Sequence, residues 1–148
     1  MDFNELIADF ATRHDMSDLV ADGNAVALDI DGIIVAIVAS DDRVTLSADI
    51  GEPPAEGQAL FADLLLEGSL QADAFFAKAP ESGLYVAVRR LALQMLDSDS
   101  FDAALEAFVN QVEVWRGLLA DFRPAAQAAG ASANEESPSF GSNGFMQV

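Results

Sequence analysis

Cysteine is absent from this chain of 148 residues, and His14 is its only histidine. Without cysteine there are no disulfide bonds, no thiolate nucleophiles and no thiolate metal sites. A single imidazole cannot supply the paired histidine ligands of a typical zinc site, and the sequence has no glycine-rich phosphate loop. We therefore expect a protein that is not an enzyme, with no catalytic residues, no cofactor and no metal site.

Basic residues are also scarce. The chain has 7 lysines and arginines against 25 aspartates and glutamates, which gives a formal net charge of -18. Such a charge repels phosphate backbones and anionic lipid surfaces, so nucleic acid is not an expected partner. No apolar run approaches the roughly 18 residues of a membrane span, and the N-terminal segment lacks the features of a secretory signal. We expect a cytoplasmic protein with no membrane insertion.

Hydrophobic residues make up 51% of the chain, which is enough for one compact domain with its own core. We place this domain at residues 1–123. From Pro124 the composition changes to Ala, Gly, Ser, Asn and Glu without periodicity, so we expect residues 124–148 to be a disordered tail.

The stretch LDIDGI at residues 28–33 resembles the first motif of haloacid-dehalogenase-type phosphatases, in which the first aspartate attacks phosphorus and the second is the general acid/base. That family needs a parallel second strand, and hence a crossover of a dozen or more residues. Only eight residues separate Asp31 from Ser40, and most are Ile, Val and Ala. An Asp-Gly pair between such runs instead predicts a two-residue hairpin turn with positive φ. The predicted pairs are Ile30 with Ile33, Leu28 with Val35, and Val26 with Ile37.

Periodicity predicts the elements on either side of this turn. Apolar residues recur every three or four positions in residues 3–14, which indicates an amphipathic helix. Residues 25–30, 33–39 and 44–50 alternate and predict a three-stranded antiparallel meander. Because residues 33–39 are apolar on both faces, they predict a central strand that is covered on both sides, once by the chain's own helices and once by something else.

The second half of the domain predicts a helix, a hairpin and a long helix. Residues 56–67 have helical spacing, with Gly68 as the expected C-terminal cap. Residues 74–79 and 84–93 flank a Pro-Glu-Ser-Gly turn, and residues 101–122 carry the most regular helical pattern of the chain. The predicted fold is α+β, an antiparallel twisted sheet (meander plus hairpin) with three helices in the order α-βββ-α-ββ-α.

Short motifs occur in a characteristic order along these elements. They are Asp31-Gly32, Ile50-Gly51-Glu52-Pro53, Leu65-Leu66-Glu67 with Leu70, Leu84 to Val88, Leu91-Ala92-Leu93 with Leu96-Asp97, and Phe101, Leu105-Glu106, Phe108, Glu113 and Trp115-Arg116. In this order they resemble the type III secretion chaperones of the Tir/CesT family. The resemblance covers residues 1 to about 122 and departs from the family pattern at Gly68-Ser69 and Ala92.

Chaperones of this family are small acidic homodimers without a cofactor. They bind the N-terminal part of a secreted effector and deliver it to the secretion ATPase in the bacterial cytoplasm. The resemblance therefore implies three partners: a secreted effector protein, a second copy of this chain and the secretion ATPase.

Surplus apolar surface supplies the candidate binding residues. The effector-binding candidates are Phe3, Leu6, Phe10, Ile34, Ala36 and Val38. The candidates for the dimer interface, where the resemblance places it, are Leu60, Phe61, Leu64, Leu65, Phe75 and Phe76.

Two other functions compete with the chaperone. The first is a bacterial regulatory or adaptor protein of the YbjN kind, which binds proteins without serving a secretion system. The second is the phosphatase suggested by residues 28–33. Arg89 and Arg90 point to opposite faces of their strand, and we expect them to pair with the chain's own carboxylates, with binding of a partner's carboxylate as the alternative.

Overall fold

The computed structural model of the protein describes residues 1–124 and contains the predicted α+β fold. In chain order, the elements are α1 (Phe3–Arg13), β1 (Ala25–Ile30), β2 (Ile33–Ser40), β3 (Arg43–Gly51), α2 (Gln58–Gln71), β4 (Phe75–Lys78), β5 (Tyr85–Ala92), the short 3-10 helix η1 (Leu93–Met95) and α3 (Ser98–Ala120). The tail predicted at residues 124–148 lies outside the described residues from residue 125 on.

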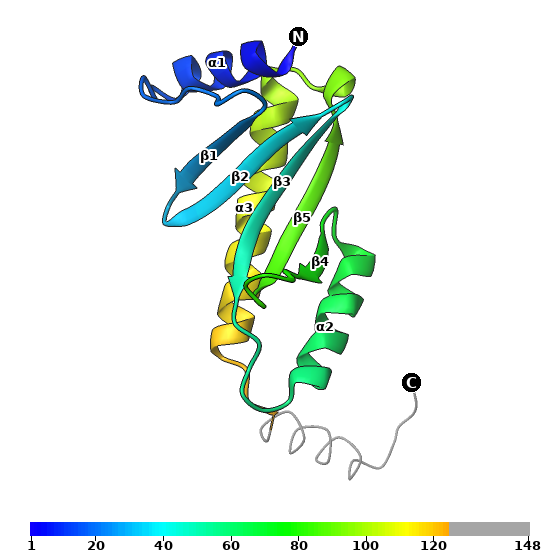
Figure 1. Cartoon of the computed structure of the whole chain (residues 1–148). Helices are drawn as coiled ribbons and strands as arrows, with labels where there is room; N and C mark the ends of the chain where they lie inside the picture. The colour runs from blue at the N-terminus through cyan, green and yellow to red at the C-terminus, as the bar shows by residue number, and fades with distance from the viewer. Residues whose placement is uncertain (125–148) are drawn as a thin grey trace.

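All five strands form one antiparallel sheet in the order β1-β2-β3-β5-β4. The meander and the hairpin become a single sheet because β3 pairs with β5 from Arg43 to Gly51, with a shift of register between Asp49 and Gly51. This pairing leaves β1 and β4 as the two edge strands (Figure 1).

The turn between β1 and β2 has the predicted geometry. Asp31 and Gly32 have φ angles of 53° and 86°, and the Gly32 N–H donates to the Asp29 carboxylate over 2.9 Å. The predicted pairs from Ile30 with Ile33 onward are all present. Because β1 and β2 are adjacent and antiparallel, this motif cannot be that of the phosphatases, whose second strand is parallel.

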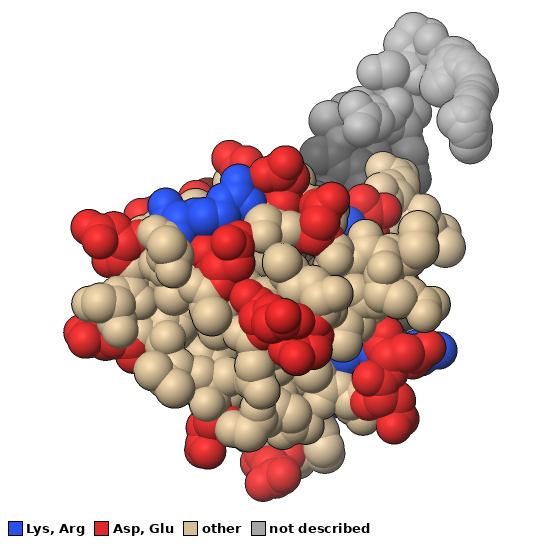
Figure 2. All heavy atoms as spheres, turned by 90° about the horizontal axis from the view of Figure 1, so that it is seen from above, with Lys and Arg blue, Asp and Glu red and all other residues tan. Residues whose placement is uncertain are grey.

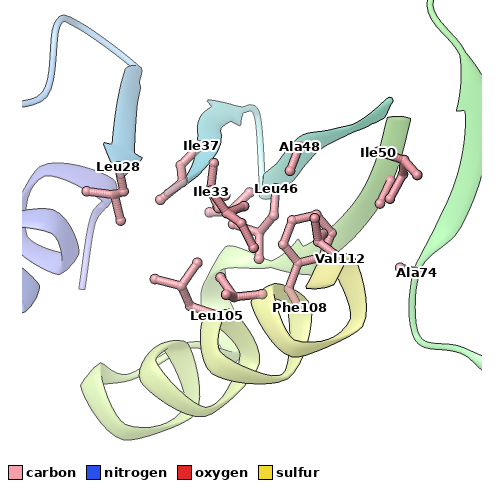
Figure 3. Packing of buried hydrophobic residues seen from close by; sticks show 14 of the residues in the cluster. Leu28, Ile33, Ile37, Leu46, Ala48, Ile50, Ala74, Leu105, Phe108 and Val112 are labelled. Atoms are coloured by element: carbon pink, nitrogen blue, oxygen red, sulfur yellow. The ribbon is translucent and has the colours of Figure 1, made fainter. Parts of the chain in front are cut away.

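One face of the sheet carries the core. Val35, Ile37, Val44 and Leu46 have no exposed surface, and they point toward α3, where Phe108 is 1% exposed. Figure 3 shows Ile37 and Leu46 of the sheet facing Phe108 of the helix, and Figure 1 shows α3 running behind the strands. Each such buried side chain stabilises the fold by about 1.5–3 kcal/mol relative to an exposed one.

Helix α1 lies on the same side of the sheet and is tied to the start of α3. The ring of Phe10 meets that of Phe101 edge to face, with 5.6 Å between the centroids. Arg13 donates to Asp99 over 2.7 Å and lies 3.5 Å from Asp102. The pKa of Arg13 is raised, chiefly by its hydrogen bond to Asp99.

A capping box begins α3, as the aspartates before it predicted. The Asp97 carboxylate accepts the N–H of Ser100 over 2.8 Å, and the Ser100 hydroxyl accepts the N–H of Asp97 over 2.9 Å. The bonds from Ser100 hold the pKa of Asp97 below its usual value. The cap satisfies backbone donors that a helix start otherwise leaves unpaired.

Helix α2 packs against the C-terminal half of α3 through an aromatic cluster. The ring centroid of Trp115 lies 5.0 Å from that of Phe76 and 6.2 Å from that of Phe61. Gly68 was expected to cap α2, and that prediction is wrong because the helix continues to Gln71. A Cβ on Gly68 would overlap the ring of Trp115, so this glycine lets the two helices approach closely.

We expect Gly68→Ala to destabilise the fold by about 1–3 kcal/mol, because the added methyl group overpacks the contact with Trp115. Gly117→Ala in α3 is the matched control, since nothing lies within 4 Å of its Cβ position. The control should stabilise the protein by about 0.5–1 kcal/mol through helix propensity. Urea unfolding of both variants measures the difference, and equal effects would contradict the close contact.

Candidate protein-binding surfaces

The face of the sheet turned away from α3 is uncovered by any described element. We call it the open face; its members are Ala25, Ala27, Asp29, Ile34, Ala36, Val38, Ser40, Arg43, Thr45, Ser47, Asp49, Phe75, Ala77, Val86, Val88, Arg90 and Ala92. All of them are exposed or half-buried. The helices of the described chain cover β2 on one side, as expected, and leave its other side uncovered.

Strand register makes the open face continuous. Ala27, Ala36, Ser47, Val88 and Phe75 lie in one row that crosses all five strands. Small side chains occupy the middle of this row, so the surface there is shallow. Such a face suits an extended or helical segment of another protein better than a small molecule, which prefers a concave pocket.

The predicted effector-binding residues divide between this face and the core. Ile34 and Val38 are 53% and 39% exposed, and Ala36 between them is half-buried. Phe3, Leu6 and Phe10 are instead 6%, 1% and 5% exposed. The prediction that these three residues lie at the surface is wrong, because the single apolar stripe of α1 packs against the core.

Helix α2 presents a second uncovered apolar surface, which we call the α2 face. It consists of Leu60, Leu64, Leu66 and Leu70, and three of these leucines are more than 40% exposed. They line a shallow hollow together with Asp63 and Glu67. A helix that is apolar on more than one side is normally buried on more than one side, and here only one side is covered.

The predicted dimer residues also divide. Leu60 and Phe75 are 42% and 38% exposed, whereas Phe61 and Leu65 belong to the core. Leu64 and Phe76 are half-buried. Sequence reasoning missed Leu66 and Leu70, which are 64% and 86% exposed. A helical projection of residues 58–71 places them away from Phe61 and Leu65, and this signal was available in the sequence.

Between α2 and strands β4 and β5 lies an apolar hollow of about 400 Å³. Its walls include Ala62 and Leu66 from α2, Phe76 and Lys78 from β4, and Tyr85 from β5. The hollow adjoins the α2 face through Leu66, which lines both. The apolar surface on this side of the molecule therefore extends from the helix to the edge strand.

Acidic side chains predominate on the upper surface of the molecule. Figure 2 shows, from above, acidic side chains in groups around the molecule, with basic side chains at only a few places. Of the two adjacent arginines, Arg89 lies 3.8 Å from Asp73 and donates to the carbonyl of Ala104 over 3.3 Å. Arg90 points to the open face, where its guanidinium lies 5.2 Å from the centroid of the Phe75 ring.

Within residues 1–124, no group of three or more His, Cys, Asp and Glu side chains is arranged to hold a metal ion. None of the helices in this part of the chain combines the length and apolarity that crossing a membrane requires.

A family model matches most of the chain. The model of the Tir chaperone protein (CesT) family matches residues 5–116. A search of curated proteins gives no match.

Several solved structures share the fold. A chain of the ExsC-ExsE complex is 22% identical, with a TM-score of 0.69, and the match covers 78% of this chain and 92% of that one. The HopA1-SchA chaperone-effector complex gives 20% identity, a TM-score of 0.66 and coverage of 76% and 91%. YbjN from E. coli gives 18% identity, a TM-score of 0.57 and coverage of 76% and 87%. At these identities the likeness establishes the fold alone.

Neighbouring positions of β2 test which face is open. Val38→Asp should change the free energy of unfolding by less than about 1 kcal/mol, because the charge stays in water. Ile37→Asp should remove about 3–5 kcal/mol or prevent folding, because it buries an unpaired charge. Urea unfolding followed by circular dichroism compares the two variants, and similar losses in both would mean that the face bearing Val38 is covered.

Proposed function

Since the chain belongs to the Tir chaperone protein (CesT) family, we propose that it is a type III secretion chaperone whose open face binds the N-terminal region of a secreted effector. In this proposal it acts in the bacterial cytoplasm, keeps the effector competent for secretion and delivers it to the secretion ATPase. It performs no catalytic chemistry and uses no cofactor.

The observation that carries this proposal is the uncovered apolar side of the inner strand β2, which we call the apolar centre of the open face. Ile34, Ala36 and Val38 present apolar side chains to water, whereas the solvent-facing side of an antiparallel sheet is normally polar. A partner segment that lies across this strand removes that apolar area from water. The segment need not be folded, because an extended chain can lie along a flat surface of this kind.

The energetics of such binding suit a chaperone. A segment that is ordered only on binding loses several kcal/mol of the gross interaction energy. Many modest contacts must then act together, and no single contact dominates the affinity. The effector can consequently be released one contact after another without crossing a large barrier at any one point.

The main rival is a regulatory or adaptor protein of the YbjN kind. Its support is the shared fold, at 18% identity. The chaperone has additional support from the family model, which matches residues 5–116. The open face serves protein binding in both cases, so the rivals differ in the identity of the partner and not in the surface.

We also propose that the chain forms a homodimer through the α2 face and the adjoining edge strand β4. Leu66 and Leu70 are among the most exposed large hydrophobic residues of the described chain. A twofold interface can bury the same patch on both subunits. Pairing of two β4 edges, or packing of two α2 helices, would cover surface that one copy leaves open.

The capture of an effector tests the main proposal. Ile34→Asp combined with Val38→Asp should weaken co-purification with the cognate effector at least tenfold, because both changes place a charge in the proposed contact. The candidate effectors are the proteins encoded beside this gene, each co-expressed with the chaperone. Val114→Asp with Leu118→Asp is the control, since these exposed residues lie on α3. Unchanged capture by a well-folded double variant of the open face would refute the assignment.

Light scattering tests the dimer. The wild-type protein should have twice the chain mass of 15.6 kDa. Leu66→Asp with Leu70→Asp should give the monomer mass at micromolar concentration, because two charges would enter the apolar contact. Met95→Asp changes another exposed apolar residue, on η1, and should leave the dimer intact. A wild-type mass of one chain at every concentration would exclude the homodimer.

A further inference from the structure

We propose that the open face selects partner segments by the order of their charges. An acidic residue of the segment would lie at the end bearing Arg43 and Arg90, apolar residues would lie over the centre, and a basic residue would lie near Asp29 and Asp49. This inference rests on the proposed function, because it specifies the chemistry of the segment bound at the same face.

The basic end is formed by two arginines on neighbouring strands. Arg90 on β5 is paired with Thr45 on β3, and Arg43 lies two residues from Thr45 on the same face. Diagonal neighbours of this kind have Cα atoms about 7–8 Å apart, so one carboxylate can lie between the two guanidinium groups.

These two arginines differ from the others in the described chain. Arg13 and Arg89 have carboxylate partners, and Arg116 and Arg123 donate to backbone carbonyls. Within residues 1–124, neither Arg43 nor Arg90 has an ion pair or a side-chain hydrogen bond to another residue.

The ring of Phe75 prepares Arg90 for a ligand. The guanidinium lies over this ring at 5.2 Å from its centroid, which holds it against the sheet. An arginine stacked in this way loses less conformational freedom when it binds a carboxylate, and it keeps its donors available at the edge of the group. Phe75 also extends the apolar centre toward the basic end.

The acidic end lies at the other end of the same strands. Asp49 is six residues from Arg43 along β3, which corresponds to about 20 Å at 3.3 Å per residue. Asp29 on β1 is paired with Ile34, whereas Val38 shares a row with Arg90 through Thr45. Ile34 therefore lies beside the acidic end and Val38 beside the basic end, with Ala36 between them. Both carboxylates are exposed. A matching extended segment therefore carries its opposite charges about six residues apart.

The net charge of -18 favours basic partners in general. A preference for an acidic residue in the bound segment is therefore the feature that this charge alone does not explain. At physiological ionic strength the screening length is about 8 Å, so the carboxylates that act at the basic end are chiefly those of the adjacent turn, Asp41 and Asp42. Within residues 1–124, neither of them forms an ion pair with Arg43 or Arg90. Each exposed ion pair changes the binding constant by only about 1.5- to 5-fold. The apolar contacts would supply most of the affinity, and the charges would set which segments bind and in which orientation.

A display library of random twelve-residue peptides tests the proposal. Peptides enriched on the wild-type protein should carry Asp or Glu on one side of an apolar stretch and Lys or Arg on the other. On the Arg43→Glu/Arg90→Glu variant, the enriched peptides should lose the acidic residue. A synthetic copy of one acidic wild-type-selected peptide should bind this variant about 10-fold more weakly, and its Asp→Lys form should bind the variant more tightly than it binds the wild type.

The control variant is Asn4→Glu/Asn110→Glu/Arg123→Glu, which changes the net charge equally at exposed positions outside the open face, the α2 face and β4. It should bind the same peptide within about 2-fold of the wild type. Enrichment that Ile34→Asp/Val38→Asp abolishes, but that shows no acidic preference, would overturn the charge order while leaving the proposed function intact. Peptides that bind regardless of Ile34→Asp/Val38→Asp, or no enrichment at all, would overturn both.

Discussion

The packing of α3 against a single face of the sheet is the constraint on which the other features depend. This helix brings Phe108 and its neighbours against β2 and β3, and α1 joins it on the same side. With α2 placed beside the sheet, no described element remains for the opposite face. The inner strand β2 therefore has one buried side and one side in water, although its sequence is apolar on both.

The contact between α2 and α3 around Phe61, Gly68 and Trp115, which we call the joint, is the second structural requirement. Phe61 is fully buried there, next to Trp115, and Gly68 allows the helices to come within contact distance. Fixing one side of α2 in this way turns its remaining leucines outward. A single packing contact thus determines which residues of the helix belong to the core and which are available to another chain.

Local patterns predicted much of this fold, because turns and strand alternation are set by neighbours in sequence. The Asp31-Gly32 turn fixed the register of β1 and β2, and hence placed Ile34, Ala36 and Val38 on one face. Contacts between distant segments were not predictable in this way. The burial of Phe3, Leu6 and Phe10 depends on α3, and the role of Gly68 depends on Trp115, which is 47 positions further along the chain. Apolar periodicity identifies a face but does not say what covers it.

Trp115 is the only tryptophan of the chain, and it lies within the α2–α3 joint, on the opposite side of the sheet from the open face. Its indole touches Phe76 and Gly68 and not the residues around Val38. Intrinsic fluorescence of this protein is therefore a local signal. A shift of its emission to longer wavelength reports water entering the joint. The packing of α2 against α3 can therefore be followed by tryptophan fluorescence without any label.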